Sequence, residues 1–312
     1  MTRQRLMEHV IEYGIRVSAG VAIAALILIF IFIGKEAVPL FTSAEARQEA
    51  SLSKLFLAQV PEEGEPPGYM WQPVSELPKY SLWPLIIGTL KVTLVALLFA
   101  FPLALGAALF TSEFAPPWLR EIVKPVIELL AGIPSVVLGF FALIVMATTV
   151  QDFFGLDYRL NTVNCGIALG LAVIPIVFTV AEDALTAVPQ SYRQGSIALG
   201  ATPWQTARRV VLPAAFPGIF AAGILGFGRA IGETMIVLMA SGNQAIPNWD
   251  LGLGFRSLSA TVASELGEVV RGSPHYHVLF FIGVLLFIFT FTINLLGQAW
   301  VGRMNRRLTG KR

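Results

Sequence analysis

Six long apolar runs, spread along most of the chain, limit most strongly what this sequence can fold into. Each carries few or no charges and reaches the roughly 20 residues that a helix needs to cross about 30 Å of hydrocarbon. Apolar residues make up 55% of the 312 residues and charged residues only 13%, which argues against a soluble domain. The sequence therefore predicts an all-α membrane protein with six transmembrane helices. These lie at or within Val17–Gly34, Ser81–Ser112, Leu129–Gln151, Leu160–Ala181, Ala214–Ser241 and Val278–Gly302.

The first run and the segment after it differ from the rest. Gly34-Lys35-Glu36 follows the run where a signal peptide would need a small-residue cleavage site, so we expect a retained anchor helix. Residues 35–80 are polar and rich in turn residues, which predicts a loop on the outer face with a short helix near Ala44–Leu57. We therefore divide the chain into an anchor helix with an outer polar loop (1–80), a five-helix membrane core (81–302) and a basic cytoplasmic tail (303–312).

Breaks between the spans follow from charge and from glycine or proline. The second span should begin with an interfacial turn at Trp83-Pro84 and end before Glu113, followed by a short charged link to Lys124. Gly132 and Pro134 fall in the first half of the third span, where such residues allow a bend or a close helix approach.

Basic residues indicate the orientation of the chain in the membrane. If both termini are cytoplasmic, the inner segments hold 13 Lys and Arg residues and the outer segments hold 7. This asymmetry agrees with the positive-inside rule, and it predicts a multi-pass protein of the cytoplasmic membrane with a cytoplasmic loop at 182–213. The inner residues are Arg3, Arg5, Arg16, Arg120, Lys124, Arg193, Arg208, Arg209, Arg303, Arg306, Arg307, Lys311 and Arg312; the outer ones are Lys35, Arg47, Lys54, Lys79, Arg159, Arg256 and Arg271.

Two charged residues, Arg229 and Glu233, lie inside the fifth run. An ionised side chain at mid-bilayer costs about 2.5–3.5 kcal/mol on insertion scales, so such residues usually have a function. Their i,i+4 spacing puts both on one face of a continuous helix, where they can pair. The alternatives are a structural ion pair that fixes helix packing, and a site in which Glu233 competes with an anionic substrate for Arg229.

Lys91 is a third charge within a span. At a rise of 1.5 Å per residue it lies about 15 Å from one face, while Arg229 lies about 22 Å from the other, so the two cations reach comparable heights. A guanidinium suits a tetrahedral oxyanion because its fork offers two parallel hydrogen bonds. Lys91 either faces the same route or snorkels towards the membrane surface.

Common enzyme motifs are missing from the sequence. We find no P-loop, no His-Glu-x-x-His and no Gly-x-Ser-x-Gly pattern. Cys165 is the only cysteine, and the pair His275-x-His277 is more typical of ordinary loop histidines than of a metal site. We therefore expect a chain that is not an enzyme and holds no cofactor or metal, with any energy coupling supplied by a partner or an ion gradient.

The predicted cytoplasmic loop carries a recognisable pattern. Gly200 and Pro203 break it into two short helical pieces, and polar residues alternate with apolar ones between Pro203 and Val211. Gln194-Gly195-Ser196, then Gly200, then Val210-Val211-Leu212-Pro213 resembles the signature of ATP-binding-cassette importer permeases, with Gln194 where that family has Glu.

That resemblance implies that the loop is a coupling helix that docks into a separate ATPase subunit. The residues it assigns to coupling are Gln194, Gly195, Ser196, Gly200, Ala201, Thr202, Pro203, Trp204, Arg208, Arg209, Leu212 and Pro213.

A narrower resemblance rests on three other stretches. Gly228–Met235, Gly88–Thr93 and Ala131–Phe140 resemble permeases of the phosphate-specific transport (Pst) family, and Thr234-Met235 favours the PstC-type subunit over the PstA-type. The resemblance implies the type I importer permease fold and ATP-driven import of inorganic phosphate. The implied partners are a second homologous permease, two ATPase subunits and a periplasmic or lipid-anchored phosphate-binding protein. We assign the substrate pathway to Arg229, Glu233, Lys91, Thr234 and Ser135.

Two other transport functions remain open from the residues alone. One is a permease of the same architecture for another oxyanion, such as sulfate or molybdate. The other is an ion-coupled secondary carrier, a class that usually shows inverted repeats and broken helices, neither of which is clear in this sequence.

Overall fold

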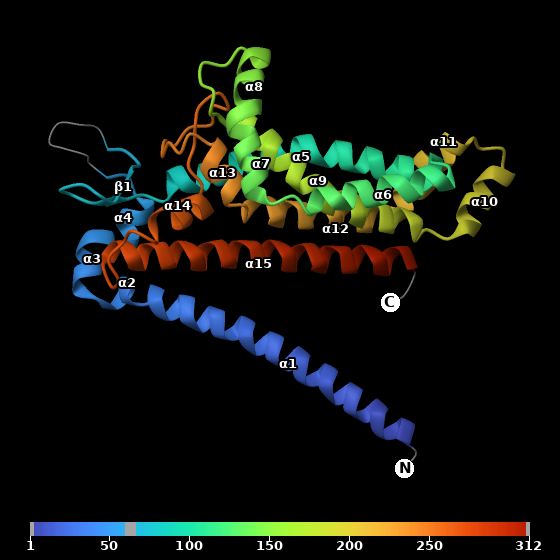
Figure 1. Ribbon diagram of the computed structural model, residues 1–312, viewed down its shortest axis with the longest axis horizontal. Helices are drawn as coiled ribbons and strands as arrows, with labels where there is room; N and C mark the ends of the chain where they lie inside the picture. The colour runs from blue at the N-terminus through green and yellow to red at the C-terminus, as the bar shows by residue number, and fades with distance from the viewer. Residues whose placement is uncertain (1–2, 60–66, 310–312) are drawn as a thin grey trace.

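The computed structural model describes residues 3–59 and 67–309, and these are mainly helical, with one short antiparallel hairpin and longer loops such as 241–257 (Figure 1). The six predicted spans are confirmed as six helices that are long and apolar enough to cross a membrane. They cover His9–Thr42, Trp83–Phe114, Ser135–Phe154, Thr162–Thr186, Pro203–Ile231 and Pro274–Met304.

Two helices, α5 (Trp83–Leu109) and α9 (Thr162–Thr186), form the centre of the bundle. A stripe of fully buried alanines spaced four residues apart on α5 faces α9, and Gly170 of α9 approaches Phe99 so closely that a Cβ atom there would lie 2.7 Å from its ring. Small residues let the two backbones come close, and close packing is the main source of helix association in a membrane. The stripe consists of Ala96, Ala100, Ala104 and Ala108.

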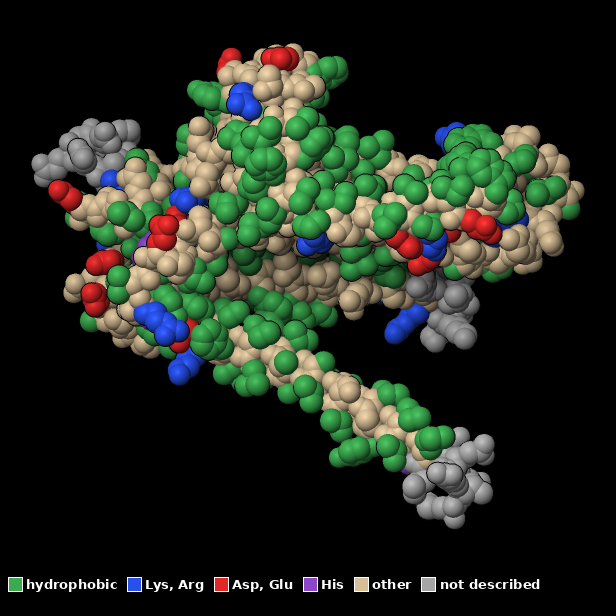
Figure 2. Space-filling view, in the orientation of Figure 1, with side chains coloured by type: hydrophobic (Ala, Val, Ile, Leu, Met, Phe, Trp, Pro, Cys, Tyr) green, Lys and Arg blue, Asp and Glu red, His purple; other side chains and the backbone are tan. Residues whose placement is uncertain are grey.

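The first helix is the most loosely attached. α1 (Arg3–Ala37) begins away from the bundle and contacts α15 (Pro274–Thr309) towards its C-terminal end, and no residue of its most apolar stretch is buried within the described chain (Figure 1). Hydrophobic side chains are spread along α1 and over the neighbouring bundle (Figure 2). The first turns of α1 and the last turns of α15 lie towards the end of the molecule that carries α10 and α11 (Figure 1).

The third predicted span is not one straight helix. α6 (Pro117–Ala131) runs beside α9, the chain breaks at Gly132–Pro134, and α7 (Ser135–Phe141) then leaves at a steep angle in Figure 1. A π-helical turn (Ala142–Met146) and α8 (Ala147–Phe154) complete this segment. Proline lacks the N–H that a helix needs and restricts the residue before it, which explains the break.

Two expected boundaries are therefore wrong. The charged link from Glu113 to Lys124 is largely helical, because the polar residues of α6 share a helix with apolar ones, and charge alone does not end a helix. The second span does not end before Glu113 either, since α5 continues through a π-helical turn over Phe110–Phe114.

The fifth predicted span is also broken. α12 (Leu212–Ile231) ends at Gly232, and α13 (Met235–Ala240) begins after Thr234. α13 packs on α7, where a Cβ atom on Gly139 would lie 3.0 Å from Sδ of Met239. Two interrupted helices thus meet directly after their breaks, a feature the sequence did not reveal.

The described residues between 38 and 80, which are 38–59 and 67–80, form a packed unit, where a loop with one short helix was expected. It holds α2 (Pro39–Thr42), α3 (Ala44–Ala50), α4 (Leu52–Phe56) and an antiparallel hairpin of β1 (Trp71–Gln72) and β2 (Lys79–Tyr80). These elements share a second hydrophobic core with α15 and α14 (Leu258–Glu265). We call this region the hairpin end of the molecule.

Candidate functional site

The segment from Gln190 to Val211 folds into two short helical pieces, as predicted. α10 (Gln190–Ala198) ends before Gly200, whose φ of 84° is a conformation that favours glycine. α11 (Pro203–Thr206) begins with a capping box in which Thr202 and Gln205 exchange hydrogen bonds, and a π-helical turn over Ala207–Val211 leads into α12. We call residues 190–211 the coupling segment.

Large apolar side chains are exposed on the coupling segment. Leu199 is 90% exposed and Trp204 55% exposed, and Tyr192 and Ile197 are exposed as well. Most of the residues assigned to coupling are exposed or partly exposed, Arg208 and Arg209 among them. Exposed apolar groups among cations at the end of a bundle suit contact with another protein better than contact with water. The motif resemblance did not single out Tyr192, Ile197 or Leu199.

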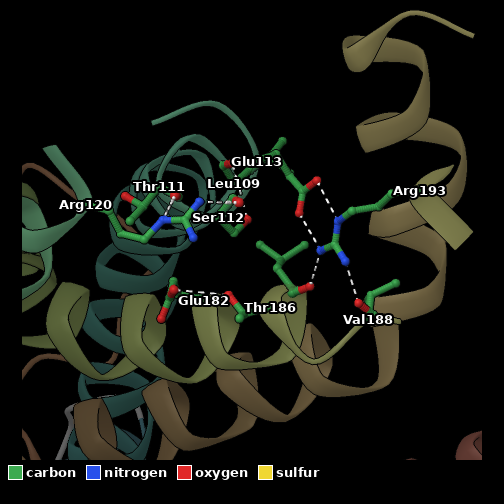
Figure 3. Close-up of polar contacts among 10 residues, drawn as sticks. Leu109, Thr111, Ser112, Glu113, Arg120, Glu182, Thr186, Val188 and Arg193 are labelled. Atoms are coloured by element: carbon green, nitrogen blue, oxygen red, sulfur yellow. Dashed lines mark hydrogen bonds and ion pairs between the residues drawn. The ribbon is translucent and has the colours of Figure 1, made fainter. Parts of the chain in front are cut away.

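Arg193 behaves differently from its basic neighbours. Its side chain is only 11% exposed and forms an ion pair with Glu113 at the end of α5 (Figure 3). From the sequence, Arg193 is one of several cations in the loop, and Glu113 is part of the charged link that leads to Lys124. Their separation of 80 positions carries no local signal that would pair them.

Arg229 and Glu233 form the predicted ion pair, with 3.4 Å between Nη2 and Oε2. They are not on one continuous helix, because Glu233 follows the end of α12 at Gly232. The Arg229 side chain is 50% exposed on this chain, whereas that of Glu233 is 4% exposed. The carboxylate of this ion pair is therefore buried and its guanidinium is accessible, next to a break in an apolar span.

The same break borders an open groove of about 830 Å³. Thr234 and Gly232 line it on one side, Ser259 of α14 and Thr290 of α15 on others, and most of the remaining lining is apolar. Ser259 Oγ also donates a hydrogen bond of 2.8 Å to the backbone oxygen of Glu233. Of the five proposed pathway residues, the structure thus brings together Arg229, Glu233 and Thr234.

Ser135 and Lys91 lie elsewhere. Ser135 is the first residue of α7, half-buried after the Gly132–Pro134 break. Lys91 is buried, and its ammonium donates hydrogen bonds to Oδ1 of Asn248 at 3.1 Å and to the backbone oxygen of Asp250 at 2.8 Å. Lys91 does not snorkel, since its charge is held by the loop that follows α13.

A polar cluster at the hairpin end was not anticipated from the sequence. The carboxylate of Glu265 accepts from Trp71 at 3.1 Å and pairs with Arg256 at 2.8 Å and with His275 at 2.9 Å. His277 instead contacts the backbone oxygen of Glu36 at 2.7 Å. The two histidines therefore do not act together, and no group of residues suited to a metal ion occurs among the described residues.

Comparison with known proteins assigns the chain to a family. Residues 100–310 match the family described as "Binding-protein-dependent transport system inner membrane component". The chain belongs to this family.

Relatives of this inner membrane component include several phosphate transport permeases. It is 31% identical to the phosphate transport system permease protein PstC of Mesorhizobium japonicum, over 91% of this chain and 89% of the relative. It is 37% identical to PstC 1 of Mycobacterium tuberculosis, covering 73% and 74% of the two chains. The probable ABC transporter permease protein YqgH of Bacillus subtilis is also 37% identical, with coverage of 72% and 73%.

Solved structures support the fold of this inner membrane component. A bacterial alginate ABC transporter in complex with its pentasaccharide-bound periplasmic protein matches with a TM-score of 0.59, 18% identity, and coverage of 94% of this chain and 95% of that chain. The inward-facing MetNI methionine ABC transporter matches with a TM-score of 0.55, 21% identity, and coverage of 71% and 96%. The predicted type I importer permease fold is therefore confirmed.

Proposed function

We propose that this membrane component is a PstC-type permease subunit of an ATP-driven importer of inorganic phosphate, and that it forms half of the translocation pathway. The observation that carries the proposal is Arg229, a half-exposed guanidinium beside a helix break in an apolar span. A cation retained in such a segment needs an anionic partner, and its fork matches the oxygens of a tetrahedral anion. The relatives named PstC support phosphate as that anion.

Glu233 favours phosphate over sulfate for a chemical reason. Phosphate near neutral pH still carries a proton, because its second ionisation lies close to this range, whereas sulfate carries none. An ionised carboxylate only accepts hydrogen bonds. Glu233 beside Arg229 therefore accepts the P–O–H group and repels a fully deprotonated oxyanion.

The partners follow from the exposed surfaces. The coupling segment offers Leu199 and Trp204 to a cytoplasmic ATPase subunit, which hydrolyses ATP in place of this chain. A second, homologous permease subunit faces the exposed side of Arg229 and completes the pathway. The hairpin end receives phosphate from a periplasmic or lipid-anchored binding protein, and the half-buried Ser135 lines the outer part of the route. Lys91 is buried and contributes by holding the loop after α13 in place.

The proposed orientation places both termini and the coupling segment in the cytoplasm. The first turns of α1 and the last turns of α15 lie towards the same end as α10 and α11, as an even number of crossings requires (Figure 1). The hairpin end then lies on the outer face. This arrangement agrees with the excess of Lys and Arg in the segments assigned to the inside.

The test is uptake of labelled phosphate into liposomes that contain the chain with its partner permease, the ATPase subunits and the binding protein. Wild type should accumulate phosphate only with ATP inside, and excess sulfate should not compete. Arg229→Gln should lower uptake by about 30-fold or more, because it removes a charged hydrogen-bond donor from the pathway. Arg229→Lys keeps the charge and should retain part of the uptake. Normal uptake in both variants would remove Arg229 from the pathway. Competition by sulfate would reassign the substrate.

A further inference from the structure

The ends of two helices, α5 and α9, lie close to one side chain, that of Arg193 in α10. Glu113 belongs to the π-helical turn that ends α5, Leu185 belongs to the last turn of α9, and Val188 follows α9. Arg193 contacts all three residues (Figure 3). A single guanidinium therefore links the coupling segment to both helices at the centre of the bundle.

The contacts use the planar fork of arginine. Nε donates to Oε2 of Glu113 at 3.1 Å and Nη2 donates to Oε1 at 2.7 Å, so the pair is bidentate. Nη2 also donates to the backbone oxygen of Leu185 at 2.9 Å, and Nη1 donates to that of Val188. Carbonyls at a helix C-terminus carry partial negative charge, which a cation offsets. Lysine lacks the fork and cannot satisfy all of these acceptors.

Burial makes this ion pair different from a surface salt bridge. The Arg193 and Glu113 side chains are 11% and 9% exposed. A buried charge that loses its partner is strongly unfavourable, whereas an exposed pair contributes little. The pair therefore resists separation when force is applied to α10.

Two further contacts make the coupling segment a single body with the end of α5. Ser196 in α10 and Thr206 in α11 share a hydrogen bond of 2.9 Å between their hydroxyl oxygens. The ring of Trp204 lies 6.1 Å from that of Phe114, the residue next to Glu113. The same turn of α5 thus holds α10 through Arg193 and α11 through Trp204.

We propose that Arg193 is a positioning residue for energy coupling: its bidentate pair with Glu113 transmits movement of the coupling segment to the tightly packed α5–α9 pair. This inference rests on the proposed function, in which an ATPase subunit binds residues 190–211. Without the pair, α10 and the end of α9 still move with the ATPase, because Arg193 keeps its bonds to Leu185 and Val188, while α5 lags behind. Hydrolysis of ATP then continues without matching uptake.

The experiment compares Glu113→Gln and Arg193→Lys with wild type in the complete importer in liposomes. Glu113→Gln leaves the bonds from Arg193 to Leu185 and Val188 in place, so the junction of α9 and α10 keeps its fold. We expect normal assembly and ATP hydrolysis within about twofold of wild type. Phosphate taken up per ATP should fall by about tenfold, because the buried Arg193 charge no longer has an anionic partner on α5. The double variant should be no worse than the more severe single variant.

Arg120→Gln is the matched control. Arg120 is also half-buried at the end of α5, where it donates to the backbone oxygens of Thr111 at 2.9 Å and Ser112 at 2.8 Å, but it belongs to α6 and has no bond to α10 in the described structure (Figure 3). Its uptake per ATP should stay at the wild-type value. An equal fall in this control, or losses that only follow the amount of assembled complex, would overturn the proposal.

A second readout does not depend on the substrate. Nucleotide binding to the wild-type complex should change amide hydrogen exchange in α10 and also at the ends of α5 and α9. In Glu113→Gln the change should remain in α10 and disappear from α5. If wild type takes up no phosphate, the proposed function fails, but this readout still tests the pair. A nucleotide-induced change in α5 of Glu113→Gln as large as that in wild type would overturn the inference alone.

Discussion

The ammonium of Lys91 lies 3.1 Å from Oδ1 of Asn248, and the same oxygen accepts the backbone N–H of Asp250, also at 3.1 Å. Because two donors meet at this oxygen, the orientation of the amide is fixed. Its Nδ2 is buried and has no hydrogen-bond acceptor among the described residues. Lys91 thus fastens α5, one helix of the central pair, to the loop after α13 through two neutral oxygens.

Asn248→Ala should loosen this loop. The substitution leaves Lys91 with one fewer acceptor and frees the amide of Asp250, and an unsatisfied buried group costs about 1–3 kcal/mol. We expect the amides of Asp250 and Gly252 to exchange faster with solvent by a factor of about ten or more, as measured by hydrogen exchange and mass spectrometry. Ile246→Ala is the control, because that side chain is exposed in the same loop. Equal exchange in Asn248→Ala and wild type would contradict the role given to Asn248.

Glu233→Gln should make phosphate bind more tightly and leave more slowly. The carboxylate competes with the anion for Arg229 at 3.4 Å. Glutamine keeps the shape and an acceptor oxygen for the P–O–H group but removes the competing charge. We expect the half-saturating concentration for uptake and the maximal rate to fall together, each by about three- to tenfold, as for a change of 0.6–1.4 kcal/mol. Transport kinetics at matched expression measure both. A lower rate with a higher half-saturating concentration would indicate that Glu233 only positions Arg229.

Hydropathy and short motifs were sufficient to predict much of the fold. The six apolar runs, the helix break at Gly200–Pro203 and the ion pair of Arg229 with Glu233 all depend on residues near one another in the sequence. Local composition decides such features, because hydropathy, glycine and proline act over a few residues.

Features that depend on distant contacts were missed. The pair of Arg193 with Glu113 and the Glu265 cluster at the hairpin end join segments 80 and 194 positions apart. The break after Ile231 was missed because Gly232 is tolerated within a helix and only the surrounding packing decides whether the helix continues. Similarly, α6 was taken for a link because its charges hide an apolar face.

Tyr80 at the hairpin end should make this region sensitive to alkali. Burial, and secondly the negative charges of Glu49 and Glu265, raise the pKa of its hydroxyl from 10.0 to about 12. Between these values the unfolded chain loses a proton that the folded chain keeps. The stability from neutral Tyr80 is therefore complete below pH 10 and is lost as the pH rises towards 12, by about 3 kcal/mol in all.

Hydrogen exchange of β1 and β2 between pH 9 and 12, corrected for the intrinsic rate, checks this expectation. Wild type should lose protection over this interval, and Tyr80→Phe should lose clearly less. Tyr69→Phe is the control, since that side chain is 39% exposed and lies beside Trp83. Parallel loss of protection in wild type and Tyr80→Phe would show that another group controls the alkaline response.

Two glycines of α5 should respond to alanine in opposite directions. A Cβ atom on Gly88 would overlap the backbone carbonyl oxygen of Arg256, which has no side-chain freedom to move away, whereas one on Gly106 would meet no atom within 4 Å. Gly88→Ala should lower stability by about 1–3 kcal/mol through overpacking. Gly106→Ala should raise it by up to about 1 kcal/mol, because alanine restricts the unfolded chain and favours the helix. Thermal unfolding of the two variants in one detergent tests both signs. Similar melting temperatures would mean that the loop at Arg256 yields more easily than its close contact with α5 indicates.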